Sequence, residues 1–216
     1  MMNKIYIIIC FFFLSNSFIF SSSQCQTINR IIIKVGASII TSEDIRNEIL
    51  TNLTVAKIEI SQENINKYKD YAIKSLIKNS IKKSEINKYK IENFNKEDLE
   101  NYISNIDKKF ADNPIGLKEI FKENNINYEV FVEKFKTELL WNTLIYSLYK
   151  NQININVIDI ENEIEQVTSL DKEKYTTTGI DKLRDKVIVN KKQEKLSLYS
   201  RSHYSNLESL ISIKFQ

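Results

Sequence analysis

The chain has 216 residues, of which 42% are hydrophobic and 27% are charged, and its formal net charge at pH 7 is +3. This apolar content is enough for one globular domain with a core. Three glycines, one proline and two cysteines exclude collagen-like, Pro/Gly-rich disordered and disulfide-scaffold classes. So few turn-forming residues also argue against a β-sandwich or a propeller. The composition therefore predicts a mostly α-helical protein.

Residues 1–23 have the pattern of a secretory signal peptide. One lysine precedes an uncharged apolar stretch, and three serines then provide small residues that suit cleavage after Ser23. The apolar core Ile5–Leu14 is too short to span a bilayer, although extending it to Phe20 leaves an uncleaved inner-membrane anchor as the alternative. The sequence therefore predicts that residues 24–216 form a single exported domain.

Two β-branched segments follow, residues 28–35 (INRIIIKV) and residues 38–40 (SII), and they flank Gly36. This pattern predicts a small β-hairpin. Thr41 or Ser42 is then expected to cap a helix with acidic residues in its first turn. A two-stranded hairpin is only marginally stable alone, so we expect another part of the chain to complete it.

Helical spacing of apolar residues recurs through the middle of the chain. The predicted helices are residues 61–89, a helix capped by Asn95 and Asp98 that carries Leu99 to Phe110, a helix from Asn113-Pro114 to Asn124-Asn125, and residues 128–149. The last of these is apolar on one face in its first half and on both faces beyond Leu139. We therefore expect another segment to cover its C-terminal half.

The C-terminal third is predicted to return to the hairpin. Residues 156–166 indicate a brief helix, residues 167–179 (VTSLDKEKYTTTG) a polar linker, and Asp181 begins another helical pattern. Residues 210–215 alternate as a strand. We predict that this strand completes the N-terminal hairpin and that the helix before it is the missing cover.

The residues available for chemistry are few. His203 is the only histidine, and without a Ser or Cys partner pattern it is better interpreted as a packing residue than as a catalytic base. No His/Cys cluster has metal-ligand spacing, and no glycine-rich phosphate-binding motif is present. The lysine-rich residues 67–90 include acidic residues and indicate a solvated face rather than a nucleic-acid interface. We expect no catalytic residue, no metal, no nucleotide or other cofactor, and no nucleic-acid partner.

The order of these parts resembles the SurA family of periplasmic chaperones, in its N-terminal domain plus C-terminal helix. The resemblance rests on the segments INRIIIKVGASIITSEDI, YAIKSLIKNSIKKSEINKYKI, NINYEVFVEKFKTELLWNTLI, ININVIDIENEI and NLESLISIKF. It implies a SurA N-terminal-like helical fold in which residues 180–216 pack back on residues 24–166. It also implies a periplasmic, ATP-independent holdase that assists outer-membrane protein assembly.

The chain departs from the family in one respect. SurA proteins usually carry parvulin-type prolyl isomerase domains where this chain has only residues 167–179, and a compact domain needs at least about 50 residues. The resemblance therefore implies a chaperone core without enzymatic activity. Two alternatives stay open: a prolyl isomerase whose active residues have no recognisable pattern, and an envelope scaffold that binds one folded partner.

The resemblance also implies an apolar crevice for the client. The expected clients are unfolded outer-membrane proteins or other aromatic-rich extended polypeptides, held by reversible burial of apolar side chains and aided by strand addition at the hairpin edge. We take Phe110, Phe121, Tyr128 and Phe131 as the candidate client-binding residues. Their spacing is also what helix packing requires, so a core role is the alternative.

Overall fold

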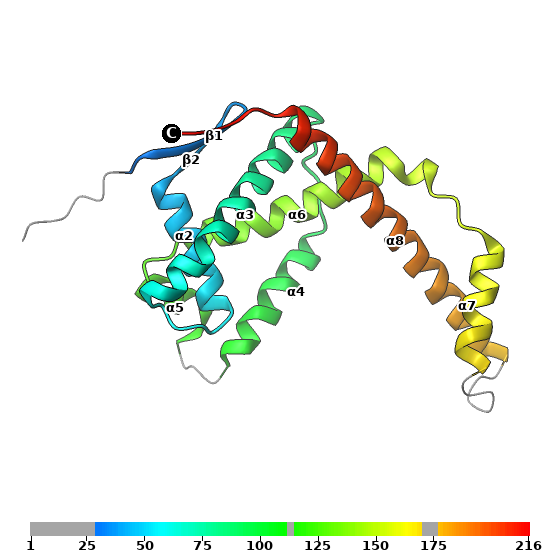
Figure 1. Cartoon of the computed structure of the whole chain (residues 1–216). Helices are drawn as coiled ribbons and strands as arrows, with labels where there is room; N and C mark the ends of the chain where they lie inside the picture. Colours follow the sequence, from blue (N-terminus) through cyan, green and yellow to red (C-terminus); the bar gives the residue numbers. More distant parts are fainter. Residues whose placement is uncertain (1–28, 112–114, 170–176) are drawn as a thin grey trace, which may run out of the picture.

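The computed structural model describes residues 29–111, 115–169 and 177–216. Within these residues the protein is mostly helical with one three-stranded antiparallel sheet, which confirms the predicted fold class (Figure 1). The predicted signal peptide, Pro114 and the centre of the predicted linker lie outside the described residues.

The elements follow one another along the chain with short connections. They are β1 (Ile31–Val35), β2 (Ser38–Thr41), α2 (Ser42–Val55), α3 (Gln62–Lys88), α4 (Lys96–Asp107), α5 (Gly116–Glu123), α6 (Tyr128–Tyr149), α7 (Val157–Ser169), α8 (Thr177–Leu210) and β3 (Ile213–Phe215), with 3₁₀ turns at Lys108–Phe110 and Lys150–Gln152.

The sheet has the order β2-β1-β3, so the C-terminal strand completes the N-terminal hairpin as predicted. Gly36 makes the hairpin turn with a φ of +57°, a conformation that suits a residue without a side chain. Ile33 on the central strand lies opposite Ile40 on one side and Phe215 on the other. The first and last described strands thus share one sheet.

The principal core lies between the sheet and the first two long helices. Ile33, Val35 and Ile40 project from one sheet face, because alternate residues of a strand point the same way. They pack on Leu53 of α2 and Ile81 of α3, all buried. This apolar contact fixes α2 and α3 beneath the sheet.

The predicted cover over α6 is present. Trp141, Leu144 and Ile145 in the second half of α6 are buried, and side chains of α8 pack on this cluster, among them Leu196 and Leu207. A helix that is apolar on two faces needs a neighbour on each. In this chain α3 lies on one side of α6 and α8 on another.

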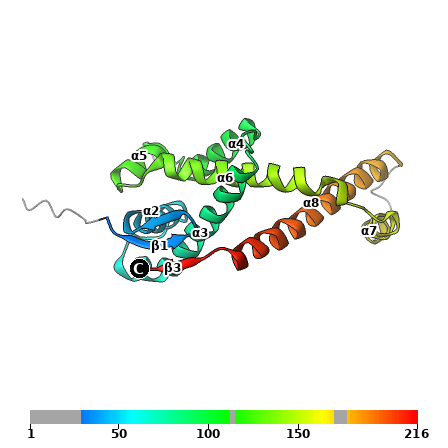
Figure 2. The same ribbon diagram turned by 90° about the horizontal axis from the view of Figure 1, so that it is seen from above.

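The other end of α8 forms an arm with α7. Ile160 and Ile164 of α7 pack on Val187 of α8 in a small core of their own. Both views show this pair of helices extending away from the sheet, while the C-terminal end of α8 returns to it (Figures 1 and 2). A single helix of 34 residues therefore connects the tip of the arm to the sheet.

Three boundaries differ from the sequence prediction. Phe110 lies in a 3₁₀ turn after α4 rather than on that helix. Leu210 is the last residue of α8 and not part of the strand. The described parts of the predicted linker, Val167–Ser169 and Thr177–Gly179, are helical. Helix α4 thus ends earlier than expected, whereas α7 and α8 extend further, because exposed polar residues suit a solvent-facing helix as well as a loop.

Candidate functional site

The main candidate site is an open groove of about 790 Å³, which lies between α2, α3 and the connection from α5 to α6. Its apolar wall consists of Ile32, Ile45, Ile49, Leu50, Ile60 and Ile65. Arg46, Lys69 and Glu123 contribute charged groups of both signs to its lining. A predominantly apolar concavity of this size is the usual form of a binding site in proteins.

Local sequence fixes the direction of α2, which provides much of the apolar wall. The Thr41 side chain accepts a 3.2 Å hydrogen bond from the main-chain N–H of Asp44, and the Asp44 carboxylate accepts 2.8 Å bonds from both the main chain and the hydroxyl of Thr41. This capping box starts the helix at Ser42. Ile45 and Ile49 then lie four residues apart and on one face.

The α5–α6 connection that closes one side of the groove is held by two residues of α2. The guanidinium of Arg46 donates a 3.3 Å hydrogen bond to the carbonyl of Asn125. The buried amide oxygen of Asn47 accepts a 2.7 Å hydrogen bond from the main-chain N–H of Asn127. Asn125 has a φ of +53°, which turns the chain back toward α6. Consecutive residues of one helix thus position the opposite side of the groove.

Two cross-helix ion pairs hold α6 against the helices of the groove. Glu48 of α2 pairs with Lys134, and Lys82 of α3 pairs with Glu138 at 2.5 Å. Lys82 is almost fully buried, and this burial lowers the pKa of its amine, while the hydrogen bond and charge of Glu138 act in the opposite direction. The ammonium of Lys82 also lies 5.3 Å from the centre of the Trp141 ring.

The structure places the four candidate client-binding residues together, but not in this groove. Phe110, Phe121 and Phe131 are buried in a second core, and Tyr128 packs against it half-buried. The rings of Phe121 and Phe131 meet edge to face, 5.1 Å between centroids. These positions match the core role that their spacing also allowed. Leu50 belongs both to this core and to the groove wall, so the two regions adjoin.

The groove could not be predicted from the sequence. Ile45 and Ile49 are core residues, and Ile65 at the edge of the same core has the same helical spacing. The spacing therefore does not indicate which apolar residues border an open groove. The local feature that could have indicated the groove is Ile60, an apolar residue in the short connection between α2 and α3. In the structure its side chain is 39% exposed.

A second, more polar cavity of about 510 Å³ lies between the start of α4, the second half of α6 and α8. Asn95, Asp98, Asn142 and Gln193 contribute to its lining. These amide and carboxylate groups favour water over an apolar client. We therefore place the candidate site in the α2–α3 groove.

The single histidine has a structural position. The Nδ1 atom of His203 lies 2.9 Å from the hydroxyl of Tyr149, and its Nε2 atom lies 3.5 Å from the buried carboxylate of Glu85. These contacts join α8 to α6 and α3. Among the described residues, no group of three His, Cys, Asp or Glu side chains is arranged to hold a metal ion.

No protein-family model matches this chain, and no curated protein matches it in sequence. Among the helices that the structure describes, none combines the length and the apolar composition needed to cross a membrane.

Proposed function

We propose that this protein is an ATP-independent holdase of the SurA type, which acts in the periplasm and binds extended apolar segments of unfolded outer-membrane proteins. The observation that supports this proposal is the open groove with Ile45, Ile49, Ile60 and Ile65 on its wall. Ile45 and Ile49 are buried in the core behind this wall, whereas Ile60 is 39% exposed and Ile65 is half-buried. The open part of the wall, at Ile60 and Ile65, suits apolar side chains that come from another polypeptide.

The proposed mechanism is weak and reversible burial. Each client Val, Leu or Phe side chain that enters the groove gains about 1.5–3 kcal/mol from leaving water. The ordering of client and groove side chains offsets part of this gain. A groove that takes a few such side chains therefore binds transiently, and release needs no nucleotide.

The charged groups of the groove agree with a broad client range. Arg46 and Lys69 are basic and Glu123 is acidic, and all three are exposed. A lining with both signs of charge does not select for one sign in the client. Such a groove discriminates by apolar content, as holding many unfolded sequences requires.

The deciding experiment measures light scattering when an unfolded outer-membrane β-barrel protein is diluted into buffer with and without the purified protein, ATP absent. The proposal expects suppressed aggregation near stoichiometric ratios. Unchanged scattering with a folded protein would favour the envelope scaffold, for which a single stoichiometric complex with one folded partner is expected.

A second assay tests the enzyme alternative. We expect the protein to leave the prolyl isomerisation of a test peptide at its uncatalysed rate, and a clear acceleration would favour the isomerase.

A pair of variants tests whether the groove is the binding surface. Ile60→Asp places a charge on the groove wall at a residue that is already 39% exposed, so folding is expected to continue. Val189→Asp makes the same kind of change on α8, a helix that contributes no residue to the groove lining, and the Val189 side chain is 56% exposed. We expect Ile60→Asp to need several-fold more protein for the same suppression and Val189→Asp to match the unmodified chain. Equal activity of the two variants would exclude the groove.

A further inference from the structure

The direction of main-chain groups in β3 follows from two hydrogen bonds at its ends. The N–H of Gly36 donates to the carbonyl of Ser212, and the N–H of Gln216 donates to the carbonyl of Ile32, both at 2.9 Å. Residues of an antiparallel strand alternate between bonding to one neighbour and facing the other way. Lys214 therefore directs its main-chain groups toward β1, as Ser212 and Gln216 do at the two ends of the strand. Ile213 and Phe215 direct their main-chain groups outward.

The outward residues are Ile213 and Phe215, and β3 is the last strand of the sheet. Figure 2 shows this strand at the outer side of β1, with no other strand beyond it. Within the described residues, the outward N–H and C=O groups of these two residues form an open sheet edge. Such an edge is a template for pairing with another extended chain.

The opposite edge of the sheet is less available. By the same alternation, the outward residues of β2 are Ile39 and Thr41, but the N–H of Thr41 is used by Asp44 in the capping box, and β2 leads directly into α2. Only Ile39 has both main-chain groups turned outward. The β3 edge is therefore the better template.

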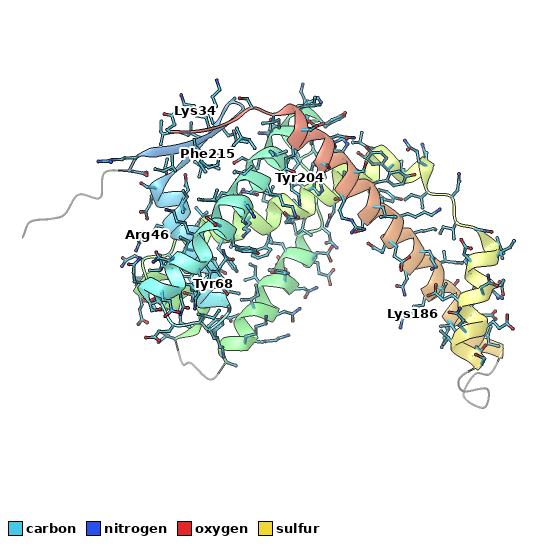
Figure 3. The ribbon with its side chains drawn as sticks, viewed as in Figure 1. Lys34, Arg46, Tyr68, Lys186, Tyr204 and Phe215 are labelled. Carbon is cyan, nitrogen blue, oxygen red and sulfur yellow. The ribbon has the colours of Figure 1, made fainter. Side chains whose placement is uncertain are left out.

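Side chains make the two faces of this edge chemically different. Phe215 lies on the same sheet face as its partner Ile33, and it is 68% exposed although Ile33 is fully buried. Lys214 lies on the other face opposite Lys34, so two positive charges stand side by side there. Figure 3 shows Phe215 and Lys34 at this end of the molecule. The edge thus offers an exposed aromatic ring on one face and cations on the other.

We propose that the β3 edge binds an extended client segment by strand addition, and that it selects segments in which apolar residues alternate with acidic ones. This inference rests on the proposed function and names the kind of segment bound at a second surface. Main-chain hydrogen bonds to Ile213 and Phe215 would provide sequence-independent affinity. An apolar client residue would then lie beside Phe215, and an acidic one beside Lys214. Strands of outer-membrane barrels alternate apolar and polar residues in this way.

Charge favours such a client over a second copy of this chain. If two β3 strands paired antiparallel with all three residues overlapping, Lys214 would lie directly opposite Lys214 of the other copy. Like charges opposite each other destabilise a sheet, and an edge lysine commonly serves to prevent self-pairing. The same lysine attracts a strand with Asp or Glu at that position.

The test uses a labelled nine-residue peptide that alternates valine with aspartate, titrated into the purified ¹⁵N-labelled protein. We expect amide shifts at Ile213, Lys214 and Phe215, and about fivefold weaker binding for a peptide N-methylated at alternate residues, because main-chain bonds are lost. Shifts confined to groove residues such as Ile65, or no loss on N-methylation, would overturn the proposal. Self-association through β3 that excludes the peptide would overturn it as well.

A charge exchange provides the second arm. Lys214→Glu is expected to weaken the aspartate peptide about threefold and to strengthen a peptide with lysine in place of aspartate by a similar factor. Lys186→Glu makes the same charge change at the arm, far from the sheet in Figure 3, and is expected to change neither. Equal responses of the two variants would contradict the proposal. Suppressed aggregation without peptide binding would support the holdase and contradict only strand addition. Peptide binding without suppressed aggregation would contradict the holdase and support strand addition.

Discussion

The indole N–H of Trp141 donates a 2.8 Å hydrogen bond to the hydroxyl of Ser200, and this bond joins α6 to α8. Trp141 is almost completely buried, so its donor has no access to water as an alternative. The bond therefore contributes more than packing: it favours one rotational setting of α8 on α6. Tyr149 and Tyr199 stack with their ring centres 4.6 Å apart along the same contact.

Ser200→Ala is expected to lower the free energy of unfolding by about 1–3 kcal/mol, because it leaves the indole N–H of Trp141 buried without an acceptor. Urea unfolding followed by the fluorescence of Trp141, the only tryptophan, measures this loss. Ser202→Ala on the exposed side of the same helix serves as the control. A loss of equal size in the control would show that the effect belongs to α8 in general rather than to this bond.

Glu138→Gln is expected to destabilise the protein by about 2 kcal/mol near neutral pH, since the buried ammonium of Lys82 then loses its charged partner. Glu133→Gln breaks a more exposed pair with Lys136 on the same helix and is expected to cost less than about 1 kcal/mol. Chemical denaturation of the three proteins under one condition provides the comparison. A greater loss in the control would contradict the role assigned to Lys82.

The penalty of Glu138→Gln is also expected to shrink as the pH rises toward 10.5, the ordinary pKa of lysine. Burial lowers the pKa of Lys82, so in the window below 10.5 the unfolded chain binds the proton more strongly than the folded one, and stability rises with pH. Tyrosines 128 and 149 have raised pKa values and give the opposite slope above pH 10. The two proteins are therefore compared with each other at every pH, and a penalty that grows with pH would refute the assignment.

Asn47→Ala is expected to cost about 1–3 kcal/mol, because it removes the acceptor for the main-chain N–H of Asn127 at the start of α6. Since this bond holds the connection beside the groove, aggregation suppression should also fall at temperatures where the variant stays folded. Asn101→Ala, an exposed asparagine on α4, is the control. Full suppression by a destabilised Asn47 variant would show that the groove does not depend on this connection.

Gly36→Ala is expected to lower stability by about 1–2 kcal/mol through backbone strain alone. A methyl group there would lie 3.7 Å from Ile211, an ordinary contact, so steric overlap adds nothing. Gly36→Asn should lose less, because asparagine tolerates positive φ better. Thermal unfolding of the two variants distinguishes them, and a larger loss for asparagine would indicate crowding at the turn instead.

Local signals in the sequence predicted local structure well. Helix α6 spans residues 128–149 as expected, and Thr41 caps α2. The two-sided apolar pattern around Trp141 and Leu144 correctly required a cover, which α8 provides. These features depend on residues close together in the chain, or on a helix that must be buried on two faces.

The sequence could not predict which apolar helix faces lack a packing neighbour. Ile65 has the spacing of a core residue, yet it is only half-buried and lies on the wall of an open groove. Phe121 has the same kind of spacing and is packed on all sides. The difference between them is made by segments distant in sequence, so no pattern within either helix distinguishes the two.

The pairing of β1 with both β2 and β3 has a consequence for the order of assembly. A chain made from its N-terminus can form the hairpin at once, but one side of β1 stays open until β3 has been synthesised. Until then, Ile33 and Val35 lack the strand that flanks them in the finished protein. Pairing of β1 with β3 therefore follows the synthesis of the helices α2 to α8 between them. A nascent chain that stops short of Ile213 is expected to be the form most open to aggregation and to proteases.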